Sequence, residues 1–244
     1  MILTTRDKEK ISCTIYNQGH KELVIIAHGF FNSQESELLL KLKNGLLSDF
    51  DVLMFDFRGH GKSSGLFSWT VKEGLDLEAV LDYAGGKYKT IGLVGFSFGA
   101  AIGINVLAGT DRVSSMVSVS APSECGKIDY RFWNLDLDND IVYNLGEGRT
   151  GKGVRPGPFW LKKIKPLDSA GKLRCPVLYI HGDKDWVIGH EHSRRLYEAT
   201  TSKKKIEIIK NGPHAEYLMR KDAGQLVKLI KQWFNQTLSE KEMK

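Results

Sequence analysis

The sequence predicts an α/β fold, in which one doubly wound, mostly parallel sheet carries helices on both faces. Short aliphatic and β-branched runs alternate along the chain with longer amphipathic stretches. Continuous apolar runs of this kind are typical of strands buried on both faces, as in parallel sheets. Strand–helix alternation predicts a doubly wound sheet. A length of 244 residues suits one such domain, so we expect a single domain over 1–244.

The predicted strands share a high content of valine, isoleucine and leucine. An initial hairpin is expected to pair Ile2–Thr5 with Ile11–Tyr16. The remaining predicted strands are Leu23–Ala27, Val52–Phe55, Ile91–Val94, Met116–Val119, Val177–Ile180 and Ile206–Ile209. Between them lie stretches with apolar residues at helical spacing. These predicted helices are Gln34–Leu47, Val71–Tyr83, Phe98–Ala108, Glu191–Ala199 and Leu218–Leu238.

Residues 122–168 interrupt the alternation and are called the cap segment below. They show no strong periodicity, and unpatterned loops of this length are usually functional lids or disordered. Four large aromatic residues favour an ordered lid, because soluble proteins seldom expose a large apolar patch. We therefore expect these residues, Phe132, Trp133, Phe159 and Trp160, to cover a substrate pocket.

Composition excludes several classes of protein. With 41% hydrophobic and 26% charged residues, the chain is not of the disordered type. It has no apolar run near the ~18 residues of a membrane span and no N-terminal leader pattern. The three cysteines, Cys13, Cys125 and Cys175, suit a reducing compartment as small buried residues, so a cytoplasmic location is expected. The net charge of +6 is dispersed, and its densest run, Lys203–Lys205, is interpreted as a solvated loop rather than a nucleic-acid contact.

The sequence Gly95-Phe96-Ser97-Phe98-Gly99 lies between a predicted strand and a predicted helix. This is the G-x-S-x-G pattern in the strand–turn–helix context that its chemistry needs. The glycines relieve crowding around a serine on a tight turn. The first N–H groups of the following helix point toward charge that develops beside Ser97.

A nucleophilic serine needs a base and a group that orients the base. His214 lies in a turn after the last predicted strand, and His181-Gly182-Asp183-Lys184-Asp185 follows the strand before it. Catalytic groups collect at the carboxyl ends of parallel strands, so we expect Ser97, His214 and one of the two aspartates to meet there. The spacing alone does not separate Asp183 from Asp185.

The strand Leu23–Ala27 ends in His28-Gly29-Phe30, where glycine allows a sharp turn that presents an N–H group. We interpret the N–H groups of Phe30 and Phe98 as the two donors of an oxyanion hole. No cofactor is expected. A Gly-Lys-Ser at 61–63 lacks the first glycine of a phosphate loop, since that position is Asp56. No metal site is expected either, because His190 and His192 have no supporting cysteine or carboxylate cluster.

Together these segments resemble the α/β-hydrolase superfamily. The landmarks are HGF at 28–30, DFRGHGKSSG at 56–65, GFSFG at 95–99, PVLYIHGDKD at 176–185 and GPH at 212–214. The resemblance covers the chain from about residue 20 to the C-terminal helix. It implies an α/β-hydrolase fold with a cap insertion at about 122–168, Ser97 as nucleophile, His214 as base and Asp185 as acid. The HGF and DxxGHGxS combination is similar to small carboxylesterases, including cinnamoyl and feruloyl esterases.

Two classes of function fit these residues. The first is a serine esterase that forms an acyl-enzyme on Ser97 and acts on a small-molecule ester; thioesterases, amidases and peptidases share its machinery. The second is a ligand-binding protein that keeps the fold and pocket without turnover. An intact Ser-His-Asp set favours the enzyme.

Overall fold

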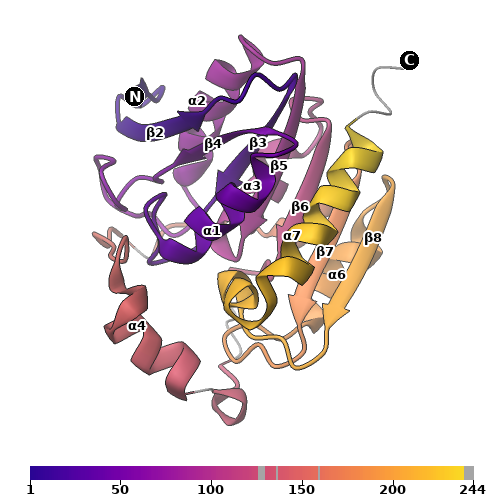
Figure 1. The fold of residues 1–244 in the computed structure, drawn as a ribbon. Coiled ribbons are helices and arrows are strands. Elements are labelled where there is room, and N and C mark those ends of the chain that lie inside the picture. Colours follow the sequence, from indigo (N-terminus) through magenta and orange to yellow (C-terminus); the bar gives the residue numbers. More distant parts are fainter. Residues whose placement is uncertain (126–129, 136, 159, 239–244) are drawn as a thin grey trace.

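The computed structural model describes residues 1–125, 130–135, 137–158 and 160–238. Its eight-stranded sheet has the order β1-β2-β4-β3-β5-β6-β7-β8, and from β4 onward neighbouring strands are parallel (Figure 1). The strands are β1 (Ile2–Thr4), β2 (Lys10–Tyr16), β3 (Glu22–Ala27), β4 (Asp51–Phe55), β5 (Thr90–Phe96), β6 (Ser115–Val119), β7 (Val177–Gly182) and β8 (Lys204–Ile209). The predicted parallel sheet is thus confirmed, and so is the hairpin, which pairs Ile2 with Ser12 and Thr4 with Lys10.

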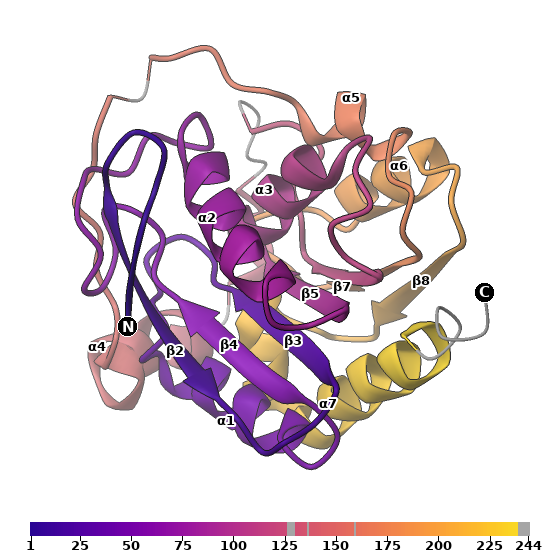
Figure 2. The same ribbon diagram turned by 90° about the horizontal axis from the view of Figure 1, so that it is seen from above.

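Helices cover both faces of the sheet (Figure 2). They are α1 (Glu37–Leu46), α2 (Glu73–Gly85), α3 (Phe98–Leu107), α5 (Pro166–Ala170), α6 (Glu191–Ala199) and α7 (Leu218–Thr237). Side chains of β3 alternate between the two cores, as a strand requires. Leu23 and Ile25 belong to the core that includes residues of α2, α3 and α6, and Val24 and Ile26 belong to the core that includes residues of α1 and α7. Within the described residues, no helix combines the length and apolar character needed to cross a bilayer.

Two local details differ from the sequence prediction. Lys204 and Lys205 are the first residues of β8 rather than part of a loop. Because β8 is the edge strand, their side chains reach solvent or helix ends without entering the core, and the Lys204 ammonium donates to the Tyr197 carbonyl oxygen at 2.8 Å. The cap segment also contains helical structure that its lack of periodicity did not indicate, over Leu137–Val142 and α4 (Tyr143–Leu145).

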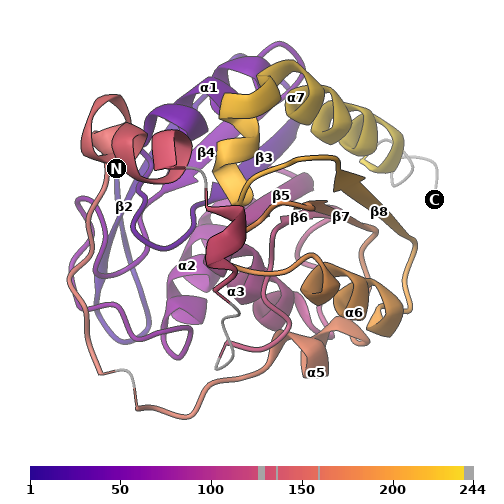
Figure 3. The same ribbon diagram turned by 90° about the horizontal axis from the view of Figure 1, so that it is seen from below.

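The cap segment lies at the end of the sheet where the strands terminate. Figure 1 shows α4 at the same end of the molecule as the carboxyl ends of β7 and β8, and Figure 3 looks onto that end. Residues 151–153 of the cap segment contact the chain that follows β3: the Gly153 N–H donates to the Phe31 carbonyl oxygen at 3.0 Å, and the Ser36 hydroxyl donates to the Gly151 carbonyl oxygen at 3.2 Å. The cap segment is therefore attached to the loop that follows β3, at the carboxyl edge of the sheet.

Candidate active site

Ser97 occupies a strained turn between β5 and α3. Its φ of +48° and ψ of −110° lie outside the regions that L-residues ordinarily adopt. Glycine at position 99 makes the turn possible, because a Cβ there would lie only 2.4 Å from the His28 carbonyl oxygen. The turn lifts the Ser97 side chain clear of the sheet at its carboxyl edge, as the G-x-S-x-G pattern predicts.

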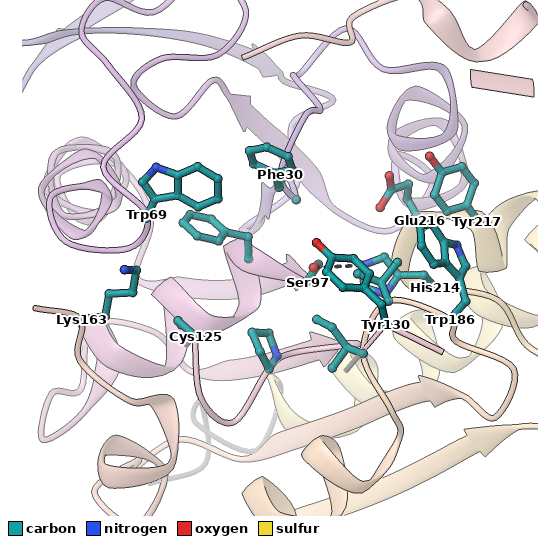
Figure 4. A pocket seen from close by; sticks show the side chains of 15 residues that line it. Phe30, Trp69, Ser97, Cys125, Tyr130, Lys163, Trp186, His214, Glu216 and Tyr217 are labelled. Carbon is teal, nitrogen blue, oxygen red and sulfur yellow. Dashed lines mark hydrogen bonds between the residues drawn. The ribbon is translucent and has the colours of Figure 1, made fainter. Parts of the chain in front are cut away.

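The structure brings Ser97, His214 and Asp185 into one hydrogen-bonded chain, of which Figure 4 shows the contact between Ser97 and His214. His214 Nε2 lies 3.0 Å from Ser97 Oγ, and His214 Nδ1 lies 2.6 Å from Asp185 Oδ2. With the proton on Nδ1 held by the carboxylate, Nε2 is free to accept the proton of the serine hydroxyl. The three residues follow β5, β7 and β8, so the sheet edge brings them together.

Asp185 is buried and is surrounded by donors. Its Oδ1 accepts the N–H groups of Val187 (3.0 Å) and Ile188 (2.9 Å), and its Oδ2 lies 3.0 Å from His181 Nε2. Burial raises the pKa of this carboxyl, but the charge of His214 and the hydrogen bonds of His181 and His214 outweigh it. The net effect holds the pKa of Asp185 below its ordinary value. The carboxylate is therefore ionised, as an orienting acid must be.

The loop after β3 lies directly against the Ser97 turn. A Cβ built on Gly29 would lie 3.4 Å from the Ser97 Cβ, so the backbone of this loop closely approaches the Ser97 turn. His28 holds the loop: its Nε2 accepts the Phe57 N–H at 3.0 Å, so its Nδ1 carries the proton and donates to the Gly29 carbonyl oxygen at 2.7 Å. Phe30 and Phe98 both border the same cavity as Ser97. Phe98 is the first residue of α3, where backbone N–H groups have no acceptor within the helix.

A cavity of about 340 Å³ opens on Ser97 and His214. Its wall is mostly aromatic, with Glu216 near His214 and Lys163 toward Trp69 and Cys125 (Figure 4). The aromatic lining residues are Phe30, Trp69, Phe98, Tyr130, Trp186 and Tyr217. Burial raises the pKa of the Cys125 thiol, which keeps this second potential nucleophile protonated at neutral pH.

Three of the four cap aromatics named from the sequence, Phe132, Trp133 and Trp160, do not line this cavity. The exposed fractions of Phe132, Trp133 and Trp160 are 65%, 80% and 74%, and Phe159 lies outside the described residues. Phe132 packs behind the lining, with its ring centroid 5.8 Å from that of Tyr130 and 6.0 Å from that of Trp186. Residues 132–134 form a 3₁₀ turn whose side chains point in different directions, which carries Trp133 outward. The expectation that these residues cover the pocket is therefore corrected for Phe132, Trp133 and Trp160.

Several residues of the site carried no separate signal in the sequence analysis. His181 is part of the HGDKD motif, yet its contact with Asp185 depends on the fold of that loop. Trp186 directly follows Asp185, and Glu216 lies two residues after His214. Their closeness in sequence to the expected acid and base is the feature that could have indicated them as site residues. His192 is buried and accepts the Ser123 N–H at 3.1 Å, and no group of three or more metal-ligating side chains forms among the described residues.

Two buried histidines near the site should make stability depend on pH. Burial lowers the pKa of His28 to about 4 and that of His60 to about 3, from an ordinary value of 6.5. Both stay neutral in the fold but take up protons on unfolding below pH 6.5. The free energy of unfolding should therefore fall as pH drops from 6.5 toward 4, by about 1.4 kcal/mol per pH unit for each histidine. Urea unfolding at pH 7, 6 and 5 measures the slope. A His60→Gln variant should show a shallower slope, and equal slopes would contradict the assignment.

Comparison with known proteins agrees with this architecture. Residues 22–139 match a family profile described as alpha/beta hydrolase fold. The uncharacterized protein YqkD of Bacillus subtilis is 29% identical over 182 residues, which cover 68% of this chain and 56% of YqkD. The chain thus spans about half the length of the first curated relatives it matches.

Solved structures match over nearly the whole chain. The Pyrococcus furiosus esterase Pf2001 superposes with a TM-score of 0.78 at 24% identity, over 98% of this chain and 92% of that one. Est1E of Butyrivibrio proteoclasticus, solved with ferulic acid bound, gives a TM-score of 0.72 at 20% identity, over 98% and 99% of the two chains. Sheet order, the turn at Ser97 and these matches define an α/β-hydrolase fold. Over residues 22–139 the chain resembles the alpha/beta hydrolase family, and its structural neighbours include esterases.

Proposed function

We propose that this protein is a serine hydrolase that cleaves carboxylic esters through an acyl-enzyme on Ser97. The observation that carries the proposal is the hydrogen-bonded chain of Ser97, His214 and Asp185. His214 Nε2 lies 3.0 Å from Ser97 Oγ, and His214 Nδ1 lies 2.6 Å from Asp185 Oδ2. Both distances are within the range of a working nucleophile–base and base–acid contact.

The proposed reaction has two halves. His214 Nε2 takes the Ser97 proton as Oγ bonds to the ester carbonyl carbon, and the imidazolium is stabilised by the ionised Asp185. The N–H groups of Phe30 and Phe98 stabilise the oxyanion. His214 then protonates the departing alcohol as the C–O bond breaks. A water molecule, deprotonated by His214, attacks the acyl-enzyme and releases the acid and free Ser97.

The cavity supports an apolar acyl or aryl ester as the substrate class. Aromatic rings form most of its wall, and its volume of about 340 Å³ suits a small or medium-sized group. The structural neighbour Est1E was solved with ferulic acid, an aryl carboxylic acid, which is consistent with including aryl esters among the candidates.

A panel of activated substrates tests the proposal. Nitrophenyl esters of increasing acyl length, aryl esters, a thioester and an anilide should be compared, with a small fluorophosphonate to label Ser97. Esters are expected to give the highest kcat/KM, with stoichiometric labelling of Ser97. Faster turnover of the thioester or anilide would reassign the bond that is cleaved. Labelling without turnover would favour the ligand-binding alternative.

Trp186 should influence the choice of substrate. It lines the cavity directly after Asp185, so Trp186→Ala is expected to change the kcat/KM ratio of aryl to acetyl esters by about 10-fold. Trp133→Ala is the matched control, since Trp133 is 80% exposed and does not line the cavity. Steady-state kinetics on both ester classes measures the ratio. A larger effect from Trp133 would show that the cap segment closes over the substrate when it binds.

A further inference from the structure

Lys152 reaches from the cap segment into a buried polar cluster beside the loop after β3. Its ammonium donates to Asn32 Oδ1 and lies 3.4 Å from Glu216 Oε1. The side chains of Lys152 and Glu216 are only 7% and 4% exposed. Both charges are thus largely removed from water, and each depends on the other, because an unpaired buried charge is strongly unfavourable.

Asn32 links this ion pair to the backbone near Ser97. Its amide nitrogen donates to Glu216 Oε1 at 2.5 Å and to the Phe30 carbonyl oxygen at 3.3 Å. A cation on the amide oxygen and an anion on the amide nitrogen fix which way the amide points, since the reverse orientation would place like partners together. The ion pair therefore sets the direction from which Asn32 holds the Phe30 carbonyl.

Two successive peptide groups of the loop are held by hydrogen bonds, one of them through the Asn32 side chain. The Phe30–Phe31 peptide is held at its carbonyl by Asn32, while its N–H points to His60 Nε2 at 3.4 Å. The preceding peptide is held at the Gly29 carbonyl by His28, and the Asn32 N–H also points to that carbonyl at 3.4 Å. In a trans peptide the N–H points opposite to the carbonyl. Holding the Gly29 carbonyl therefore aims the Phe30 N–H, and holding the Phe30 carbonyl through Asn32 fixes the next peptide, which limits rotation of the Phe30 backbone.

We infer that Lys152 is a positioning residue for the oxyanion hole: through Asn32 and Glu216, it fixes the loop that presents the Phe30 N–H to the reacting carbonyl. This inference rests on the proposed function and adds a role for the cap segment beyond selecting substrates. The cap supplies one charge of the buried cluster, and the loops after β3 and β8 supply Asn32 and Glu216. One ion pair thus joins the cap segment, the oxyanion loop and the loop that carries His214.

Lys152→Met tests the inference, because methionine keeps an apolar stem of similar length and removes the charge. We expect kcat to fall by about 10- to 100-fold with KM within about 3-fold of wild type, since a displaced oxyanion donor weakens transition-state binding rather than substrate binding. Affinity for a trifluoromethyl ketone, which forms a tetrahedral oxyanion on Ser97, should fall in parallel. The matched control is Lys162→Met at an exposed cap lysine, which should behave as wild type.

A double variant separates positioning from loss of structure. Glu216→Gln in the Lys152→Met background removes the unpaired charge and leaves an amide oxygen for Asn32. It should therefore recover part of the lost kcat. If Lys152→Met does not fold, Asn32→Ala takes its place and should show the same fall in kcat at constant KM. An unchanged kcat and ketone affinity in the folded variant, or a loss confined to KM, overturns the inference.

The outcome also distinguishes this inference from the proposed function. Wild-type protein that neither hydrolyses any ester nor reacts with the fluorophosphonate overturns both. If wild type labels without turnover, the labelling rate becomes the readout, because phosphonylation of Ser97 also passes through an oxyanion. An active wild type with a fully active Lys152→Met variant overturns only the role of Lys152.

Discussion

A Ser97→Ala variant is expected to lose about 10⁴- to 10⁶-fold in kcat for ester hydrolysis while keeping its fold. In the proposed mechanism the Ser97 hydroxyl is the group that bonds to the substrate, and it is the group that lies 3.0 Å from His214 Nε2. Alanine fits the same space, and Asp185 remains paired with His214. The measurement is kcat on a nitrophenyl ester, with far-UV circular dichroism and the thermal midpoint as checks of folding.

Cys125→Ala provides the control for this experiment. Cys125 lines the same cavity, and burial raises the pKa of its thiol, so its removal should change kcat by no more than a few-fold. If the Ser97→Ala variant kept a tenth of the wild-type activity, Ser97 would not be the nucleophile. A large loss in Cys125→Ala with an active Ser97→Ala would transfer that role to the cysteine.

Asp185→Asn is expected to lower kcat by about 10⁴-fold. The Asp185 carboxylate faces four donors: the rings of His214 and His181 and the N–H groups of Val187 and Ile188. An asparagine amide would turn an NH₂ group toward at least one of them. If it faces His214, Nδ1 must accept, and the proton moves to Nε2, where it blocks transfer from Ser97.

Asp183→Asn is the matched substitution two residues away. The structure pairs Asp185, not Asp183, with His214, so Asp183→Asn should stay within a few-fold of wild-type kcat. Comparing kcat/KM of the two variants at pH 7 and 9 gives the ranking. The reverse ranking would assign the orienting carboxylate to Asp183.

Much of the fold follows from local pattern. Buried strands such as Leu23–Ala27 are continuous apolar runs because helices cover both faces of a parallel sheet. Such a run therefore predicts a buried strand from the local sequence alone. The meeting of Ser97 with His214 is likewise predictable, because parallel strands place their carboxyl ends on one edge. Helix ends differed by a few residues: the first predicted helix, Gln34–Leu47, begins at Glu37 in the structure, since terminal turns depend on contacts beyond the helix.

The local sequence could not predict which aspartate faces His214 or which residues of the cap segment are buried. Asp183 and Asp185 share one loop, and only the path of that loop after β7 decides which carboxylate faces His214. Trp133 and Trp186 are both tryptophans, but Trp133 is exposed and Trp186 lines the cavity. Lys152 and the exposed Lys162 are both lysines of the cap segment, and the local sequence does not distinguish them. Lys152 is buried because it contacts Asn32 and Glu216, which are distant in sequence. Such contacts require the three-dimensional arrangement.

Ser97, Asp185 and His214 are widely separated along the chain, and this separation affects the order of events during folding. Ser97 and His214 are 117 residues apart, and Asp185 precedes His214 by 29. In the proposed mechanism, a nascent chain that extends only to the end of β8 contains Ser97 and Asp185 but lacks His214, so it cannot hydrolyse an ester. Closing loops of this length is slow compared with forming a local turn. For the proposed hydrolase, activity should therefore first appear during refolding or translation when the loop that carries His214 docks, and not when the sheet forms.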